Sequence, residues 1–384
     1  MSDTDHAAVL RRQFLRTSGT IGTVAVAGCS RLDLRDESNA NQSNEQDGEE
    51  TDDDRAASVS VHEDVTYAAR DAGEMKLDLY VPETDENPPL VVYIHGGGWV
   101  FETRKNAPDL ARYAAEWGCA ITSVSYRLAA IPDDADFPTE SIENNPTPRG
   151  VFPDQIIDVK AAIRWLRANA DEYGFDAARV ATWGASAGGH LAALAGTLDD
   201  IETLPGDAYP DDAIAKVVAP DQSGTVQAVV DWYGISDLLE LPSQPDGFES
   251  FLLGGDVSEN RDKAKRASPT TYVGPETPPF LITHGREDQV VSIRQSRLLF
   301  EALQASAVGA TMYELHDLGH VFGAESERTA MEQLIVDPRP AQTVTATAHL
   351  EAGAETGAST DGLLERAPPA GPDAIEQFLD RTIA

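Results

Sequence analysis

Cysteine, lysine and long hydrophobic runs are all scarce in this chain of 384 residues. Its two cysteines argue against the disulfide-rich scaffolds of small secreted domains. The mildly apolar stretch at residues 17–28 is too short to span a membrane. No internal repeat is visible. With 41% hydrophobic residues, the chain can bury the core of one large α/β domain or of two smaller ones.

Positive charge is also in short supply, because 29 basic residues, six of them lysine, face 65 acidic ones. Residues 1–32 carry a net charge of +2 and residues 33–54 one of −9, so residues 55–384 still hold −29 of the total of −36. Nucleic acid is therefore excluded as a partner, since phosphate binding needs a basic surface. The acidity suits concentrated salt, which screens self-repulsion. This composition resembles that of proteins from salt-loving archaea.

The N-terminal residues have the features of an export signal. Arg11 and Arg12 in "LRRQFLRTSG" resemble a twin-arginine signal, and "VAGCS" resembles a lipoprotein cleavage box with Cys29 as the lipid acceptor. This resemblance implies a signal at residues 1–29 and a protein held by that lipid at the extracellular face of the cell membrane. A chance amphipathic N-terminus is the alternative. Residues 30–58 are acidic, contain almost no apolar residue, and are predicted to form a disordered spacer.

The rest of the chain, residues 59–384, alternates strand-like and helix-like segments. Alternating apolar and polar residues at 65–69 and 75–82 predict a hairpin at a sheet edge, and the continuous apolar runs at 89–95 and 119–128 predict buried parallel strands. Further strands are expected at 179–183, 226–234, 278–285 and 310–317, and helices at 106–118, 154–174, 187–198 and 293–305. This order predicts the α/β class, with a mostly parallel, doubly wound sheet and helices on both faces. Cys119 is expected to be a buried core thiol.

The stretch "RVATWGASAGGHLAAL" at 179–194 contains Gly-x-Ser-x-Gly around Ser186. Small residues allow a tight turn from a strand into a helix, which exposes the serine oxygen beside unpaired amides at the helix start. That environment suits a nucleophile. Glycine-rich helix starts also occur by chance where a helix packs closely on a sheet, so the motif alone leaves the role open.

A second glycine-rich stretch, "HGGGW" at 95–99, directly follows a predicted buried strand. Backbone without side chains can approach a ligand and direct its N–H groups at it. Such donors stabilise the negative oxygen of a tetrahedral intermediate, each by about 3 kcal/mol. A phosphate-binding loop is disfavoured because no G-K-[ST] follows. A plain loop is the remaining alternative.

Two later segments supply an acid and a base. "FLITHGREDQVV" offers Asp288 shortly after a predicted strand, with Glu287 as the neighbouring candidate, and an acid there can hold the tautomer of a histidine. "LHDLGHVFG" offers His320, whose ordinary pKa of about 6.5 suits a general base. His316 is the rival. It falls on the predicted strand, so we choose His320.

Along the chain the four motifs come in the order HGGGW, Gly-x-Ser-x-Gly, the segment with Asp288 and the segment with His320. In this order they resemble the α/β-hydrolase superfamily and most closely its esterase branch of hormone-sensitive-lipase-like and acetylxylan- or feruloyl-esterase-like enzymes. "SYRLA" and "DWYGISDL" add to the likeness, which covers about residues 65–323 and a last helix near 372–383. The chain departs from the family's usual pattern through insertions near 131–150 and 325–369 in the catalytic domain.

The resemblance implies a role for each matching residue. Ser186 is the nucleophile, His320 acts as base and then acid, and Asp288 orients His320. The donors that would stabilise the oxyanion are backbone N–H groups, namely those of Gly97 and Ala187, assisted by Gly98.

The substrate pocket is predicted less specifically. Residues 237–275 are expected to supply much of it, with Trp99 and Tyr233 beside it. The expected function is a serine carboxylesterase for short or medium acyl esters, with acetylated carbohydrates as a first guess, and with neither metal nor organic cofactor. An arylformamidase is the alternative enzyme, since HGG-x-W also marks that branch. The non-enzymatic alternative is a tethered binding module of the same fold.

Overall fold

The computed structural model describes residues 57–70, 73–132, 135, 145–199, 201, 204, 218–241, 247–315, 318–323, 346–352 and 370–384. Cys29, His316 and most of residues 30–58, 131–150 and 325–369 therefore lie outside the described residues. Within the described part of the chain, no helix combines the length and the apolar character that crossing a membrane requires.

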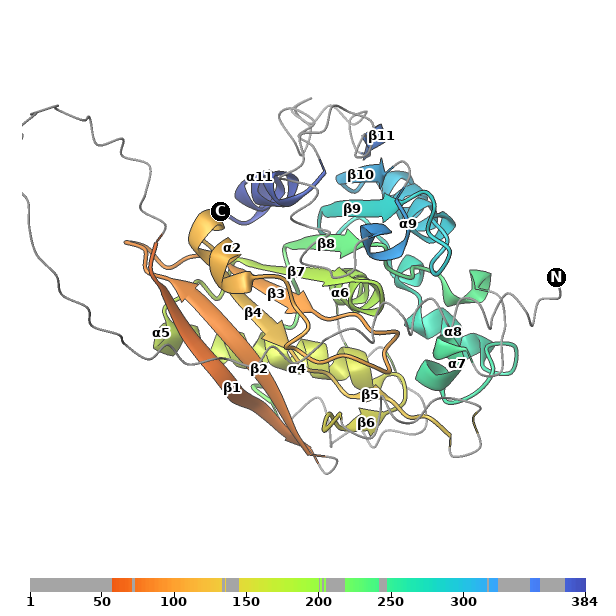
Figure 1. Cartoon of the computed structure of the whole chain (residues 1–384), viewed down its shortest axis with the longest axis horizontal. Helices are drawn as coiled ribbons and strands as arrows, with labels where there is room; N and C mark the ends of the chain where they lie inside the picture. The colour runs from red at the N-terminus through yellow and green to blue at the C-terminus, as the bar shows by residue number, and fades with distance from the viewer. Residues whose placement is uncertain are drawn as a thin grey trace, which may run out of the picture.

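One large sheet forms the centre of the domain, with the strand order β1-β2-β4-β3-β7-β8-β9-β10-β11 (Figure 1). Its strands are β1 (Val59–Arg70), β2 (Gly73–Pro82), β3 (Leu90–Ile94), β4 (Ala120–Val124), β7 (Val180–Ala185), β8 (Ala228–Trp232), β9 (Phe280–Gly285), β10 (Ala310–Leu315) and β11 (Ala346–Ala352). The six neighbouring strands β4, β3, β7, β8, β9 and β10 are parallel to one another. The pairs β1–β2, β2–β4 and β10–β11 are antiparallel. The predicted α/β class and edge hairpin are thus confirmed, while β11 is a strand that the sequence presented only as part of an insertion.

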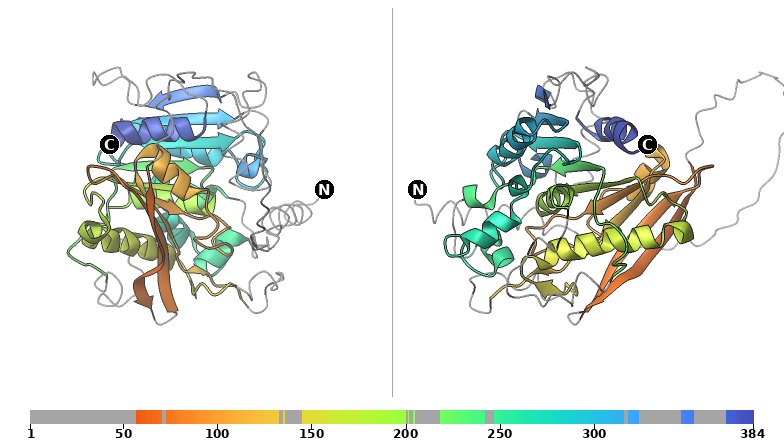
Figure 2. Two further views of the ribbon diagram at one scale, coloured as in Figure 1. Left: turned by 60° about the vertical axis from the view of Figure 1, so that its left-hand side comes forward. Right: turned by 180° about the vertical axis from the view of Figure 1, so that it is seen from behind.

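Helices cover both faces of this sheet, as Figure 2 shows. They are α2 (Leu110–Trp117), α4 (Asp154–Ala168), α5 (Ala170–Tyr173), α6 (Ala187–Thr197), α7 (Phe248–Leu253), α8 (Arg261–Ala267), α9 (Arg294–Ala305) and α11 (Pro372–Thr382), with short 3₁₀ turns η2 (Leu238–Glu240), η3 (Pro269–Thr271) and η4 (His320–Gly323). Side chains of α2 and α11 pack on one face, and side chains of α4, α6 and α9 pack on the other. A separate two-stranded pair joins β5 (Leu128–Ala129) to β6 (Arg149–Gly150).

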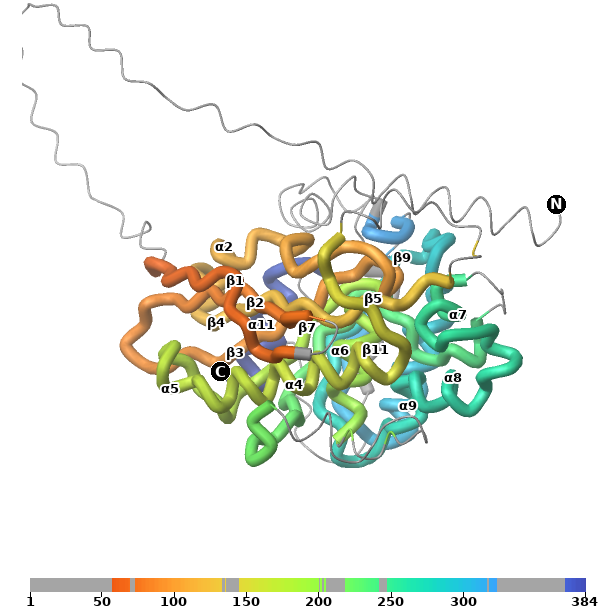
Figure 3. Tube along the Cα trace, turned by 90° about the horizontal axis from the view of Figure 1, so that it is seen from below, coloured from red at the N-terminus to blue at the C-terminus, as the bar shows by residue number. Residues whose placement is uncertain are grey.

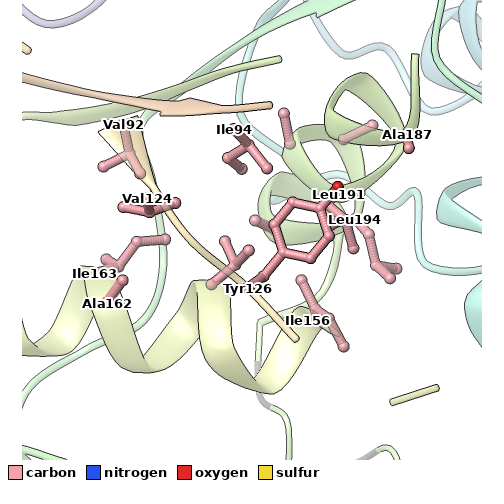
Figure 4. Close-up of a cluster of buried hydrophobic side chains, with 14 of the residues drawn as sticks. Val92, Ile94, Val124, Tyr126, Ile156, Ala162, Ile163, Ala187, Leu191 and Leu194 are labelled. Atoms are coloured by element: carbon pink, nitrogen blue, oxygen red, sulfur yellow. The ribbon is translucent and has the colours of Figure 1, made fainter. Parts of the chain in front are cut away.

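The central strands are mostly apolar because both of their faces are buried. On β3, Val92 and Ile94 belong to the cluster with α4 and α6, whereas Val91 and Tyr93 belong to the cluster with α2 and α11. Successive side chains of a strand point to opposite faces, so a strand covered on both sides loses its polar alternation. Figure 4 shows the first of these clusters, where Val92 and Ile94 lie near side chains of α4 and α6.

The predicted single helix over 154–174 is wrong in one respect, because it is interrupted at Asn169. This residue leaves helical geometry at φ −112° and ψ 12°, and its side-chain amide donates to the carbonyl of Trp165 at 2.7 Å. Asparagine competes for backbone acceptors in this way, which weakens helix interiors. The chain then continues as the separate short helix α5.

The loops that carry the sequence motifs all follow the carboxyl ends of parallel strands. They come after β3, β7, β9 and β10, which is the edge where open α/β sheets bind ligands. Helices α7 and α8 lie together beyond this edge, on the side to which the arrows of β7 to β9 point in Figure 1. Figure 3 also shows these two helices beside each other. The fold therefore gathers the four motifs at one end of the sheet.

Candidate active site

Ser186 occupies the sharp turn between β7 and α6. Its backbone adopts φ 56° and ψ −119°, a strained conformation for a residue with a side chain. The neighbouring glycines make the turn possible, since a Cβ on Gly184 would lie 2.2 Å from the carbonyl oxygen of Gly188 and one on Gly188 would lie 2.0 Å from that of Ile94. The small residues around Ser186 are thus required by close backbone contacts.

Three side chains from different loops meet at this turn. His320 in η4 places Nε2 3.1 Å from Ser186 Oγ and Nδ1 2.7 Å from Asp288 Oδ2. The carboxylate accepts a hydrogen bond from Nδ1–H, which keeps the proton on Nδ1 and leaves Nε2 able to accept the proton of the serine hydroxyl. Glu287, the neighbouring candidate for the acid, is exposed to solvent and contributes no contact to His320 among the described residues.

Asp288 is held by donors on both of its oxygens. Oδ1 accepts the backbone N–H groups of Val290 and Val291, each at 2.8 Å, and Oδ2 also lies 3.3 Å from Nε2 of the buried His284. Burial alone would raise the pKa of Asp288, but the neighbouring His320 and the hydrogen bonds from both histidines outweigh it and hold this pKa below its ordinary value. The carboxylate therefore stays ionised and fixed in orientation.

The loops after β9 and β10 are fastened to each other, which fixes the distance between Asp288 and His320. A Cβ on Gly285 would lie 2.3 Å from the carbonyl oxygen of Leu318, and the N–H of Glu287 donates to that same oxygen at 2.9 Å. Such close contact between two backbones requires glycine at this position.

The loop after β3 presents unpaired donors near the serine. Gly97 and Gly98 have φ of 87° and 58°, and a Cβ on Gly97 would lie 2.6 Å from the carbonyl oxygen of Phe101. Within the described residues, the N–H groups of Gly97, Gly98 and Ala187 have no protein acceptor. Backbone donors kept free in this way are what an oxyanion hole needs.

His95 and Tyr126 support this loop from behind. The two rings stack at 4.4 Å, and the Tyr126 hydroxyl lies 3.1 Å from the carbonyl oxygens of both His95 and Gly96. Burial lowers the pKa of His95 to about 3, so its ring stays neutral. The sequence placed Tyr126 only within the family motif "SYRLA", and the structure shows that it contacts His95 and Gly96.

The described end of the first insertion is also anchored here. Arg149 on β6 donates to the carbonyl oxygens of Ala129 at 2.7 Å and of Val100 at 3.3 Å. Arg127, next to Tyr126, forms two close hydrogen bonds with the carboxylate of Asp158 on α4, at 2.7 and 3.0 Å. The segment around 149–150 therefore packs against the glycine-rich loop.

Trp99 and Tyr233 do not form an open pocket wall as predicted. Trp99 is 2% exposed and Tyr233 is fully buried. The Tyr233 ring packs edge-on against His320 at 4.8 Å and against Phe322 at 4.9 Å, so it supports the base from the interior. The sequence does not distinguish a large aromatic residue that faces the pocket from one that faces the core.

Phe248, at the start of α7, covers the glycine-rich loop instead. A Cβ on Gly98 would lie 3.1 Å from Cγ of Phe248, and the Phe248 ring packs edge-on against Phe101 at 5.9 Å. Its side chain is half-buried. The sequence indicated only that residues 237–275 form part of the pocket, because nothing local shows which residue reaches the loop.

Two buried histidines near the site were given no role by sequence reasoning. His284 stands before the acid loop, and His190 lies one turn into α6. Their spacing from the motifs was the only available signal. Cys119 is buried as predicted, and burial raises its pKa to about 12. In the part of the chain that is described, no three histidine, cysteine or acidic side chains are grouped as a metal site.

Comparisons with known proteins identify a family and its relatives. The sequence matches the BD-FAE family over residues 77–303. It is 30% identical over 277 residues to the probable carboxylic ester hydrolase LipM of Mycobacterium tuberculosis, covering 70% of this chain and 57% of LipM. It is 34% identical to the esterase LipC of the same organism, covering 63% of this chain and 56% of LipC. The chain spans about half the length of the curated relatives it matches.

Solved structures give the same fold. A truncated carbohydrate esterase from gut microbiota superposes with a TM-score of 0.58 at 29% identity, covering 73% of this chain and 95% of that one. Esterase Est2 of Thermogutta terrifontis superposes with a TM-score of 0.52 at 23% identity, covering 72% of this chain and 88% of that one, and supports the fold alone. The chain has the α/β-hydrolase fold and belongs to the BD-FAE family.

Proposed function

We propose that this protein is a serine carboxylesterase that hydrolyses short-acyl esters through an acyl-enzyme. The observation that carries the proposal is the hydrogen-bonded line from Ser186 through His320 to Asp288, next to unpaired backbone donors. The relatives named as esterases support the same reaction. The whole arrangement lies on loops at the carboxyl edge of the sheet.

The first half of the reaction follows from the distances. Ser186 Oγ attacks the ester carbonyl carbon while its proton passes to His320 Nε2, and the carbonyl oxygen becomes negative. The N–H groups of Gly97 and Ala187 donate to that oxygen. Asp288 stabilises the positive charge that develops on His320. The intermediate then collapses, and His320 gives the proton to the departing alkoxide, which leaves as an alcohol.

The second half repeats these roles with water. The acyl group is now bound to Ser186 Oγ, and His320 removes a proton from a water molecule that attacks the acyl carbon. A second oxyanion forms at the same donors. When it collapses, Ser186 Oγ recovers a proton from His320 and the carboxylic acid is released.

The preference for short acyl groups rests on Phe248. Its ring lies against Gly98, a proposed oxyanion donor, and therefore beside the carbon that is attacked. A ring at that place leaves little room for a long acyl chain. Acetylated carbohydrates are the first class of natural substrate to test, since a relative of solved structure is a carbohydrate esterase.

The test is hydrolysis of p-nitrophenyl esters from acetate to octanoate by the full chain in concentrated KCl, with Ser186→Ala in parallel. We expect rates that fall with acyl length and a loss of at least about 10³-fold in kcat in the variant, as for other serine triads. An active Ser186→Ala protein would overturn the nucleophile. A folded wild-type protein that cleaves no ester but cleaves an aryl formamide would make it a formamidase.

A further inference from the structure

The oxyanion hole proposed above is assembled from two separate segments. Gly97 and Gly98 belong to the loop after β3, whereas Ala187 is the first residue of α6. Donors that act on one oxygen must be held in a fixed relative position, because a displacement of about 1 Å can reduce a rate about 100-fold. Some contact must therefore tie the loop to the helix.

Trp99 is the loop residue best placed to make such a contact. It directly follows Gly98, and its backbone adopts φ 59°, which is unfavourable for a residue with a large side chain. Its carbonyl oxygen accepts the N–H of Ala129 at 2.7 Å. Its indole Nε1, however, points to α6 and lies 3.1 Å from Nδ1 of His190.

His190 is fully buried on α6, three residues after Ala187. Its other ring nitrogen, Nε2, lies 2.7 Å from the carbonyl oxygen of Ala267, at the end of α8. The indole N–H can only donate and the carbonyl can only accept, so His190 must carry its proton on Nε2 and accept at Nδ1. The two rings also pack edge to face at 5.2 Å.

Burial keeps this arrangement in one state. It lowers the pKa of His190 to about 4, so the ring is neutral at neutral pH and Nδ1 is available as an acceptor. His190 thereby links three parts of the molecule, namely helix α6, which follows Ser186, the glycine-rich loop, and the end of helix α8.

We propose that His190 is a positioning residue, which fixes the glycine-rich loop against α6 through the hydrogen bond from Trp99 and so aligns the two halves of the oxyanion hole. This inference rests on the proposed esterase function. His190 is fully buried and its hydrogen bonds go to Trp99 and Ala267, so its effect should fall on kcat rather than on KM.

The first test is kinetic and uses p-nitrophenyl acetate. His190→Leu removes both hydrogen bonds, Trp99→Phe removes only the indole donor, and His190→Gln retains an acceptor and a donor. We expect kcat to fall by about 100-fold in His190→Leu and by about tenfold in Trp99→Phe, with KM within about threefold, and His190→Gln to recover part of the loss. The double variant should lose no more than His190→Leu alone, because both changes break one contact.

Trp183→Phe is the matched control. Trp183 is a buried tryptophan on β7, and its indole nitrogen has no hydrogen-bond partner in the described part of the chain. It should lose stability without losing kcat. Equal kcat losses in Trp99→Phe and Trp183→Phe, or multiplicative losses in the double variant, would overturn the proposal.

A second readout separates this inference from the esterase function. The ¹⁵N shifts of the His190 ring should show an Nε2–H tautomer in the wild-type protein and a changed Nδ1 shift in Trp99→Phe. If no ester is cleaved but these shifts are found, the proposed function fails while the contact stands. If the shifts show an Nδ1–H tautomer or do not respond to Trp99→Phe, the contact itself is refuted.

Discussion

The two sides of the candidate site present different groups, namely backbone N–H donors on one side and titratable side chains on the other. On the side of the glycine-rich loop and the start of α6, backbone packs directly against backbone, as at Gly188 and the carbonyl of Ile94. On the side of the loops after β9 and β10, side-chain hydrogen bonds link Asp288 to His320 and His320 to Ser186. In the proposed reaction, the first side provides fixed dipoles, and the second moves a proton. We therefore expect substitutions on the first side to displace backbone donors, and substitutions on the second side to impair proton transfer.

The largest effect is expected on the proton-transfer side. Asp288→Asn keeps the shape of the acid, but its amide can donate a hydrogen bond to Nδ1, so His320 should adopt the wrong tautomer and kcat should fall by about 10⁴-fold. Steady-state hydrolysis of p-nitrophenyl acetate measures this change. Glu287→Gln is the matched control, because Glu287 is adjacent in sequence but exposed, and it should keep full activity. A large loss in the control would mean that the acid is wrongly assigned.

The next effect belongs to the backbone side. Gly97→Ala places a Cβ only 2.6 Å from the carbonyl oxygen of Phe101, at a residue whose φ is 87°. The loop must move, and kcat should fall by about 10²- to 10³-fold through loss of a donor. Gly118→Ala is the control, since Gly118 also has positive φ but has nothing within 4 Å of the added carbon. It should cost about 1 kcal/mol of stability and leave kcat intact, and equal kcat losses would refute the steric argument.

These two predictions differ in how far sequence alone could have supplied them. The glycine motifs could be recognised in the sequence because a close backbone contact admits only glycine. The four motif loops meet at the end of the sheet where they were expected. The position of the two acids alone did not separate Asp288 from Glu287, since adjacent acids differ only in burial, and the family resemblance favoured Asp288. The other histidine candidate, His316, lies outside the described residues.

Contacts between distant segments were also beyond the sequence. Trp99 was expected beside the pocket, yet its indole meets a histidine 91 residues away. Strand β11 has no sequence signal comparable to the apolar runs of the central strands, because it is an edge strand. The interruption of the helix at Asn169 is a local competition for acceptors that periodicity does not register. The fold class can be predicted from the sequence pattern, whereas contacts between residues far apart in the chain can be found only from the three-dimensional structure.

A smaller effect concerns the ion pairs that tie Arg104 and Lys105, a few residues after the glycine-rich loop, to the edge hairpin. The buried Asp78 on β2 accepts the N–H of Asp64 at 2.8 Å and pairs with Lys105 and Arg104 at 3.0 and 3.1 Å. Asp78→Asn should lower the free energy of unfolding by about 2 kcal/mol at pH 7, less than for a fully buried pair because Lys105 is half-exposed. Chemical denaturation at fixed salt measures it.

The pH dependence of that difference has a definite sign. Burial raises the pKa of Asp78, but the hydrogen bonds from Asp64, Lys105 and Arg104 outweigh it, so the pKa is below its ordinary 3.8. The stabilisation is complete above 3.8 and is lost as pH falls through the lower folded value. The gap between wild type and variant should therefore shrink below about pH 4. Asp85→Asn, at an exposed site, should show no gap, and a gap for Asp78→Asn that widens in acid would contradict the account.

The smallest effect is on specificity. Phe248→Ala removes the ring that lies against Gly98 and should raise kcat/KM for p-nitrophenyl octanoate relative to acetate by about tenfold, through the space released. The acetate rate in the same variant is the internal reference. An unchanged ratio would show that another part of residues 237–275 limits acyl length.

The account's central claim is that Ser186 is the nucleophile activated by His320. Treating the full chain with a fluorophosphonate and mapping the labelled peptide by mass spectrometry tests it most directly, with His320→Ala in parallel. We predict one phosphonyl group on Ser186 and labelling slowed by at least about 10³-fold in the variant. A label on another residue, or esterase activity that survives complete labelling of Ser186, would contradict the claim.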